Sequence, residues 1–213
     1  MHQSRVWLAT EENDPRKILL LGGEVRSASS SPVQINQAPS IASYLSRAVS
    51  EDFDLLVLCL SARVHQERDA VVELCGILRT NRYTREKPLI AVIPGRHREL
   101  LNRLEKAGVR YVMITEPGRD DLHLRLTTLD LPLSNAYRVE SLLMEVCPFI
   151  NYTPLNSCRE LILCGAYRNR LVLGPYRLAQ RCEVPAHLTC EYYQAQEKMA
   201  PATPPGGRHQ CQP

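Results

Sequence analysis

Four short apolar runs alternate with amphipathic stretches between Lys17 and about residue 130, and this alternation constrains the fold more than any other feature. Each run is continuously apolar and is bounded by polar, glycine or proline residues. That pattern is typical of strands that are covered on both faces of a parallel sheet. The runs are residues 18–21, 55–60, 89–93 and 111–114. Strands and helices alternating at this spacing predict a doubly wound α/β domain with a mostly parallel sheet.

Between the apolar runs, hydrophobic side chains recur with the 3.6-residue period of amphipathic helices. Residues 40–51 form one such stretch, and Ser40 is a suitable N-cap at its start. Residues 71–78 and 100–107 carry the same period, and Gly108 follows the second of these where a helix would end. We therefore expect three helices between the strands.

The first strand is followed closely by the next candidate strand, residues 33–36. Only about ten residues separate the two, whereas a parallel crossover that contains a helix usually needs about a dozen or more. We expect the first helix of the domain to be shortened or absent. Residues 5–10 are a candidate for an extra edge strand.

The composition changes after residue 130. Residues 137–146 have the pattern of a helix that leads into Cys147 and Pro148, and the density of cysteine then rises. The last residues are rich in proline and glycine, which favours disorder. We predict four segments: an N-terminal extension (1–16), an α/β domain (17–130), a cysteine-rich module (131–194) and a disordered tail (195–213).

The cysteine-rich module is too small to bury a large core by itself. Four thiolates on one metal centre would supply the missing constraint, because metal binding is then coupled to folding. Both zinc and a cysteine-ligated iron–sulfur cluster fit such a donor set, and ordinary packing of reduced cysteines is the alternative. The predicted ligands are Cys147, Cys164, Cys182 and Cys190, with Cys158 as a possible substitute. The module resembles small bacterial C-terminal modules in which Cys-Pro, Cys-Gly-Ala and two further cysteines follow one another.

Residues 17–24 read Lys-Ile-Leu-Leu-Leu-Gly-Gly-Glu, a short strand that runs into a turn. With residues 53–60, 88–94 and 107–117, this stretch resembles the strands of a response-regulator receiver domain. The resemblance covers about residues 17–130. It implies a receiver-like fold that acts in signal transduction through protein partners.

The positions that carry receiver chemistry are all altered. Gly22 and Gly23 stand where the resemblance places an acidic pair, and Cys59 stands at the phospho-acceptor. Ile93 replaces the hydroxyl residue, and Glu116 replaces the lysine. The carboxylates of a receiver hold Mg²⁺ during phosphoryl transfer, so the resemblance implies no Mg²⁺ at this site and no phosphorylation. Cys59, between two leucines, favours a buried apolar role over a thiol switch.

The remaining features narrow the function classes. A net charge of +3 is too small to indicate nucleic-acid binding by itself. No apolar run reaches the roughly 18 residues of a membrane span, and we expect a cytoplasmic protein. No nucleophile–base pair, phosphate-binding glycine loop or metalloprotease motif points to an enzyme.

We therefore predict a non-enzymatic signalling adaptor with a phosphorylation-dead receiver-like domain and a metal centre that senses redox state or metal. The alternatives are a nucleic-acid-binding transcriptional regulator, which would use the arginines and tyrosines of the module, and an electron-transfer protein.

Overall fold

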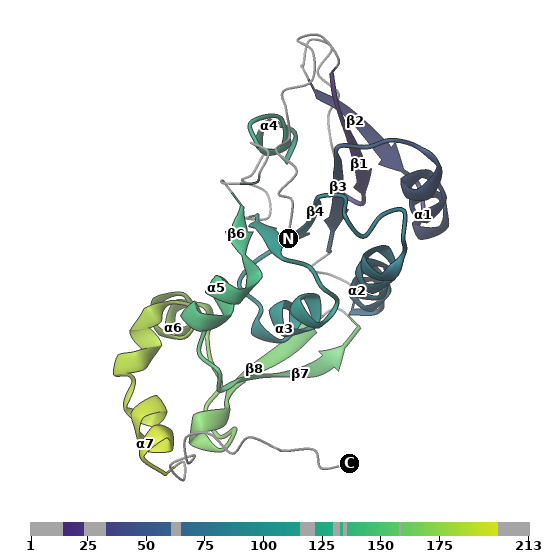
Figure 1. The fold of residues 1–213 in the computed structure, drawn as a ribbon. Coiled ribbons are helices and arrows are strands. Elements are labelled where there is room, and N and C mark those ends of the chain that lie inside the picture. Colours follow the sequence, from purple (N-terminus) through teal and green to yellow (C-terminus); the bar gives the residue numbers. More distant parts are fainter. Residues whose placement is uncertain are drawn as a thin grey trace, which may run out of the picture. The chain divides into compact units, whose positions relative to one another are not determined.

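The computed structural model describes residues 15–23, 33–60, 65–115, 122–129, 133, 136–157 and 159–199. The chain divides into two compact units, Met1–Ser141 and Leu142–Pro213. Figure 1 shows the elements of both units. No helix in the described ranges is long and apolar enough to cross a membrane.

The first unit is built on a six-stranded sheet with the order β2-β1-β3-β4-β5-β6. The first five strands are parallel, and β6 runs antiparallel to β5. This order reverses direction between β1 and β3, as in one of the common doubly wound arrangements. The strands are β1 (Arg16–Leu21), β2 (Val33–Ala38), β3 (Leu55–Cys59), β4 (Leu89–Ile93), β5 (Tyr111–Ile114) and β6 (Tyr137–Arg138). The predicted α/β class with a mostly parallel sheet is confirmed.

Helices cover both faces of this sheet (Figure 1). α1 (Ile41–Ser50), α2 (His65–Thr80) and α3 (Arg98–Lys106) belong to successive crossovers in one direction along the sheet, which places right-handed connections on one face. α4 (Leu122–Thr127) covers the other face, where its Leu126 packs in one buried cluster with side chains from β1, β3, β4 and β5. Because successive strand residues point to opposite faces, the continuously apolar strands serve both layers.

Most predicted elements of this unit are confirmed, including the strand that starts at Val33. Ser40 is the N-cap of α1, and its side-chain oxygen accepts a hydrogen bond from the Ser43 amide at 3.2 Å. The helix predicted from residue 137 starts two residues later as α5 (Val139–Glu145), because Tyr137 and Arg138 pair with β5. The predicted domain boundary at residue 131 therefore lies before strand β6. The candidate edge strand at residues 5–10 and the connection at 24–32 lie outside the described residues.

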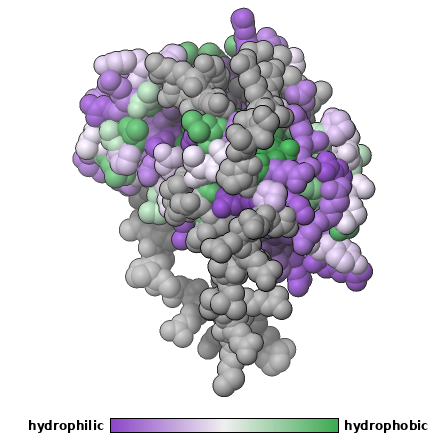
Figure 2. Space-filling view, turned by 90° about the horizontal axis from the view of Figure 1, so that it is seen from above, coloured by the Kyte–Doolittle hydropathy of each residue, from purple (hydrophilic) through white to green (hydrophobic). Residues whose placement is uncertain are grey.

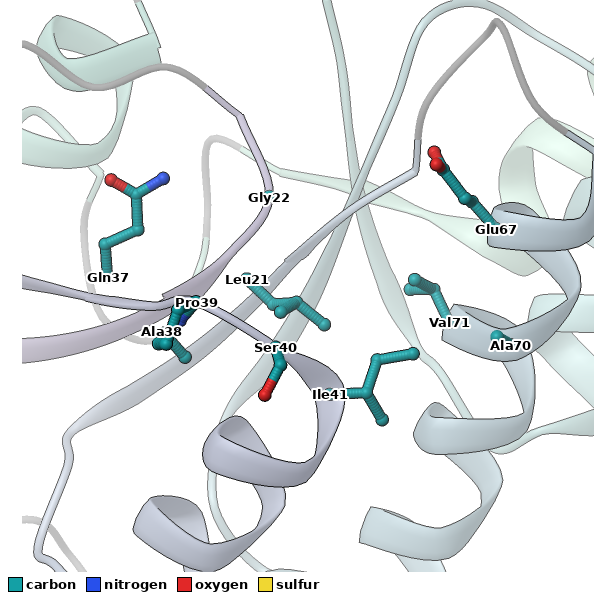
Figure 3. A pocket seen from close by; sticks show the side chains of 10 residues that line it. All are labelled: Leu21, Gly22, Gln37, Ala38, Pro39, Ser40, Ile41, Glu67, Ala70 and Val71. Carbon is teal, nitrogen blue, oxygen red and sulfur yellow. The ribbon is translucent and has the colours of Figure 1, made fainter.

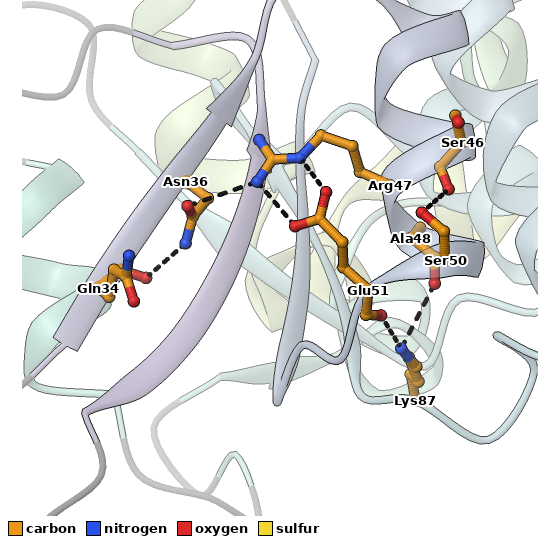
Figure 4. A network of polar contacts seen from close by, with 8 residues as sticks. All are labelled: Gln34, Asn36, Ser46, Arg47, Ala48, Ser50, Glu51 and Lys87. Atoms are coloured by element: carbon orange, nitrogen blue, oxygen red, sulfur yellow. Dashed lines mark hydrogen bonds and ion pairs between the residues drawn. The ribbon is translucent and has the colours of Figure 1, made fainter.

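The C-terminal end of α1 is fastened by polar contacts (Figure 4). Lys87 Nζ donates to the carbonyl oxygens of Glu51 at 2.9 Å and Ala48 at 3.4 Å. Arg47 bonds both carboxylate oxygens of Glu51, at 2.7 and 3.0 Å, and reaches Asn36 of β2 at 3.4 Å. A cation at the end of a helix satisfies carbonyl groups that have no partner within the helix.

The second unit is made of short and irregular elements. The antiparallel hairpin of β7 (Ile150–Asn156) and β8 (Arg159–Cys164) leads into the 3-10 turn η1 (Gly165–Tyr167). The later elements are α6 (Pro175–Arg177), the π-helical turn η2 (Leu178–Cys182), the 3-10 helix η3 (Pro185–Thr189) and α7 (Glu191–Met199). This chain path brings residues from 147 to 196 back onto one another.

Hydrophobic side chains also reach the surface. On the face drawn in Figure 2, hydrophobic residues show through between hydrophilic ones. Among the described residues, Met144 and Tyr176 are each 76% exposed. Single exposed apolar side chains are ordinary on protein surfaces, so the exposure of these two residues does not by itself indicate a binding site.

Candidate functional site

Three of the predicted phosphorylation positions meet at the carboxyl ends of β1 and β3. Leu21 pairs with Leu58, so Gly22 and Gly23 follow β1 beside Cys59. Both glycines have a positive φ, 72° and 76°. A Cβ on Gly22 would lie 3.2 Å from the Cys59 carbonyl oxygen, and one on Gly23 would lie 3.1 Å from its Sγ and 3.0 Å from Leu122. A side chain at Gly23 would therefore meet Cys59 and α4.

The environment of these positions is apolar. Burial raises the pKa of the Cys59 thiol to about 12, so this thiol stays protonated at neutral pH. Cys59 and Leu122 both pack against the buried cluster on the α4 side of the sheet. Ile93 is fully buried at the end of β4. Glu116 lies outside the described residues.

A cleft of about 850 Å³ opens next to this point, between the ends of β1 and β2 and the starts of α1 and α2 (Figure 3). Its lining is mostly apolar, with Gln37, Ser40 and Glu67 as polar members. Gln37 is already engaged, because its Nε2 donates to the Gly23 carbonyl oxygen at 2.9 Å.

The four predicted metal ligands come from four different segments of the second unit. Cys147 follows α5, Cys164 ends β8, and Cys182 ends η2. Cys190 precedes α7 and occupies its N-cap position, because the Gln194 amide donates to the Cys190 carbonyl oxygen at 3.0 Å. Cys147 and Cys164 are buried, and Cys182 and Cys190 are partly buried. Cys158 lies outside the described residues.

Backbone hydrogen bonds join three of these segments. The Cys147 amide donates to the Cys182 carbonyl oxygen at 2.7 Å. Cys164 pairs with Ile150 in the hairpin, and the next amide, that of Gly165, donates to the Phe149 carbonyl oxygen at 2.7 Å. The chain around Cys147 thus contacts the segments of both Cys164 and Cys182.

Aromatic and polar contacts bring α7, and with it Cys190, onto the same segments. The ring of Tyr193 lies 5.7 Å from that of Phe149 and 5.1 Å from that of His187, centroid to centroid. The Tyr167 and Tyr192 rings are 4.8 Å apart. Gln196 Nε2 donates to the carbonyl oxygen of Ala166, in η1, at 3.1 Å.

The other three cysteines of the group act on the pKa of the Cys182 thiol. Its pKa is raised to about 11, first by burial and then by the charges that Cys147, Cys164 and Cys190 would carry. Arg177 acts in the opposite direction and lowers the pKa of the same thiol. Without a bound cation, the Cys182 thiol therefore stays protonated at neutral pH.

Proximity of this kind is a looser condition than coordination. Within the part of the chain that the structure describes, no three or more His, Cys, Asp or Glu side chains are grouped as ligands of one metal ion. Charges influence one another over several ångströms, whereas zinc–sulfur bonds of about 2.3 Å bring tetrahedral ligands to within about 4 Å of each other. The electrostatic influence and the absence of a grouped ligand set are both satisfied if the four thiols lie around one region but farther apart than the ligands of a single metal ion.

The donor set fits a metal centre in its chemistry. All six cysteines in the described ranges are free thiols, and four of them belong to this group. Cys59 and Cys75 belong to the first unit, where burial raises the pKa of each to about 12. The four candidate ligands thus lie in the second unit, and the other two described cysteines lie in the first.

Two further residues shape this region and were not predicted. Gly165 has no room for a side chain, because a Cβ would lie 2.8 Å from Asn151 Nδ2 and 2.9 Å from the Phe149 carbonyl oxygen. His187 is 3% exposed, and its Nδ1 is 2.8 Å from the Val184 carbonyl oxygen. The glycine directly after Cys164 is part of the Cys-Gly-Ala motif in the sequence, whereas the burial of His187 left no sequence signal.

No protein-family model matches the chain, and the comparisons with curated proteins and with solved structures found no significant match either.

Proposed function

We propose that the second unit holds a metal centre through Cys147, Cys164, Cys182 and Cys190. The observation that supports this proposal most directly is the set of contacts that brings four separate cysteine segments together around the Cys147–Cys182 backbone hydrogen bond. When no cation is present, Cys147, Cys164 and Cys190 raise the pKa of the Cys182 thiol. A bound metal cation reverses that effect, because it stabilises thiolates.

The centre is an iron–sulfur cluster or zinc, and the ligand pattern favours the cluster. The four cysteines lie far apart in the sequence, without the Cys-x-x-Cys pairs of many structural zinc sites. An iron–sulfur cluster would supply one-electron redox chemistry or a response to iron. Zinc would supply folding energy alone.

The first unit is proposed to be a receiver-like interaction platform that is not phosphorylated. Gly22, Gly23 and Cys59 occupy the end of the sheet where a receiver binds Mg²⁺, and their surroundings are apolar. Without carboxylates at these positions, Mg²⁺ has no hard oxygen ligands there. The whole chain then acts as a non-enzymatic signalling adaptor of the cytoplasm, where reduced thiols persist, with protein partners on the first unit.

The decisive experiment is to purify the full chain without oxygen and to measure iron, acid-labile sulfide and zinc per chain. We expect a stoichiometric metal centre, with a brown colour if it is an iron–sulfur cluster. Cys164→Ser should abolish it, and the matched control Cys59→Ala should retain it. A chain that carries no metal under these conditions, or a Cys164→Ser variant that keeps it, would reject the proposal.

A further inference from the structure

A hollow of about 560 Å³ opens in the second unit beside Cys190. Arg177 and Arg181 line it together with Thr189 and Glu191. The two arginines are four residues apart in the helical turns that end at Cys182, so they project from one side of those turns. The proposed metal ligands explain Cys190 but not the two arginines.

Both guanidinium groups are held in place without being neutralised. Arg181 Nη1 donates to Thr189 Oγ1 at 3.0 Å, and the Arg177 guanidinium lies over the Tyr192 ring, 5.7 Å from its centroid. Within the described ranges, neither group forms an ion pair with a carboxylate. A guanidinium has five N–H donors, so most of these donors remain for a ligand.

The lining of the hollow contains one acidic residue, Glu191. The lining thus carries two cations against one anion. Tyr176, which is 76% exposed, adds an aromatic ring to the wall.

We propose that this hollow binds a small ligand with a carboxylate or phosphate group, which Arg177 and Arg181 hold as a pair. Planar guanidinium groups match such oxyanions with two parallel hydrogen bonds, and a concave site suits a small molecule better than a flat surface does. The ligand would lie beside the metal centre, since Cys190 lines the hollow. This coupling, but not the binding itself, rests on the proposed function.

Binding is tested by calorimetry on the full chain at constant ionic strength, with citrate and pyrophosphate as the carboxylate and phosphate probes. We expect saturable binding of at least one probe. Arg177→Gln and Arg181→Gln should each weaken it about tenfold or more, since each removes charged hydrogen bonds. Arg181→Lys keeps the charge but loses the planar fork, so its effect should be smaller. The matched control is Arg170→Gln, an exposed arginine of the same unit that does not line the hollow.

The proposal is overturned if neither probe binds saturably, or if Arg170→Gln weakens binding as much as Arg177→Gln does. It is also overturned if a single-stranded oligonucleotide binds while both probes fail, because the arginines would then serve a nucleic acid. Circular dichroism of each variant establishes that it is folded.

The coupling has a separate readout. In metal-loaded protein, saturation with the better probe should shift the reduction potential or the absorption spectrum of the centre, and Arg177→Gln should remove the shift. A chain without metal rejects the proposed function, while the calorimetry still decides on the hollow. A metal centre with binding but no shift rejects the coupling.

Discussion

The two units of this chain are stabilised by different means. In the first unit, side chains from neighbouring parallel strands are fully buried, among them Leu20, Leu56 and Ile90. Among the described residues after Val146, the least exposed is His187, which is 3% exposed. Burial of apolar area contributes roughly 25 cal/mol per Å², so the first unit has a large driving force and the second has a small one. The second unit therefore depends on specific contacts between its cysteine segments.

The backbone differs in the same way. The first unit consists mostly of regular parallel ladders, with helices in three of the crossovers, and among its described non-glycine residues only Leu133 has a positive φ. The second unit contains two 3-10 turns and a π-helical turn, and its Arg168 and Asn169 both have positive φ values, 52° and 58°. Such conformations cost energy in residues other than glycine and persist where the surroundings hold them. Asn169 is held by the amide of Asn151, which donates to its side-chain oxygen at 2.7 Å.

The largest expected effect comes from Cys182→Ser. We expect loss of the metal and loss of hydrogen-exchange protection across residues 147–196, because metal binding would supply much of the folding energy of this unit. The first unit should keep its protection. Cys75→Ala should show the reverse, with weaker protection in the first unit and unchanged metal content. A Cys182→Ser variant with full protection throughout would remove the contrast between the units.

Leu56→Ala should destabilise the first unit by about 3 to 5 kcal/mol, because it removes a fully buried side chain from the middle of the sheet. Urea unfolding followed by circular dichroism measures this loss. Metal content should stay unchanged. A loss of metal along with the lowered stability would show that the two units fold as one.

Gly165→Ala should destabilise the second unit by about 1 to 3 kcal/mol, since the added methyl group would press on the Phe149 carbonyl oxygen and on Asn151. Hydrogen exchange of residues 147–170 is the suitable measurement. Gly174→Ala is the matched control, because a Cβ there meets no atom within 4 Å. Equal effects of the two substitutions would contradict the tight packing after Cys164.

Lys87→Met should lower the stability of the first unit by about 1 kcal/mol, because the carbonyls of Ala48 and Glu51 lose their side-chain donor (Figure 4). Arg85→Met serves as the control. Its ion pair with Glu86 is exposed, with 60% of the arginine side chain accessible, and should contribute little. Thermal unfolding of both variants would reveal whether the network at the end of α1 matters more than a surface pair.

The last prediction is that treatment with a phosphate donor has no effect on this chain. After treatment with acetyl phosphate and Mg²⁺, the chain should carry no acid-labile phosphate, because Gly22, Gly23 and Cys59 offer neither Mg²⁺ ligands nor an aspartate. Mass measurement of the intact protein is sufficient. A stoichiometric acyl phosphate would mean that a carboxylate elsewhere had taken over the reaction.

The sequence was most informative where structure follows from local pattern. Strands β4 and β5 begin and end at the predicted residues, because a continuous apolar run reflects burial on both faces. Ser40 as a helix N-cap was equally predictable, since capping uses a side chain three residues from its partner. Strand β6 was not predictable, because its two exposed residues form a strand only by pairing with β5.

The sequence by itself determined the α/β character of the first unit and the kind of atoms available in the second, namely thiols spread over residues 147–190. Only the tertiary structure decided which of those residues meet. The Cys147 amide donates to the Cys182 carbonyl oxygen, Gly165 packs against the Phe149 carbonyl oxygen, and Arg177 lies near Cys182. Periodicity and composition are local properties of a chain, whereas convergence depends on the path of the turns between the elements, and no local pattern encodes that path.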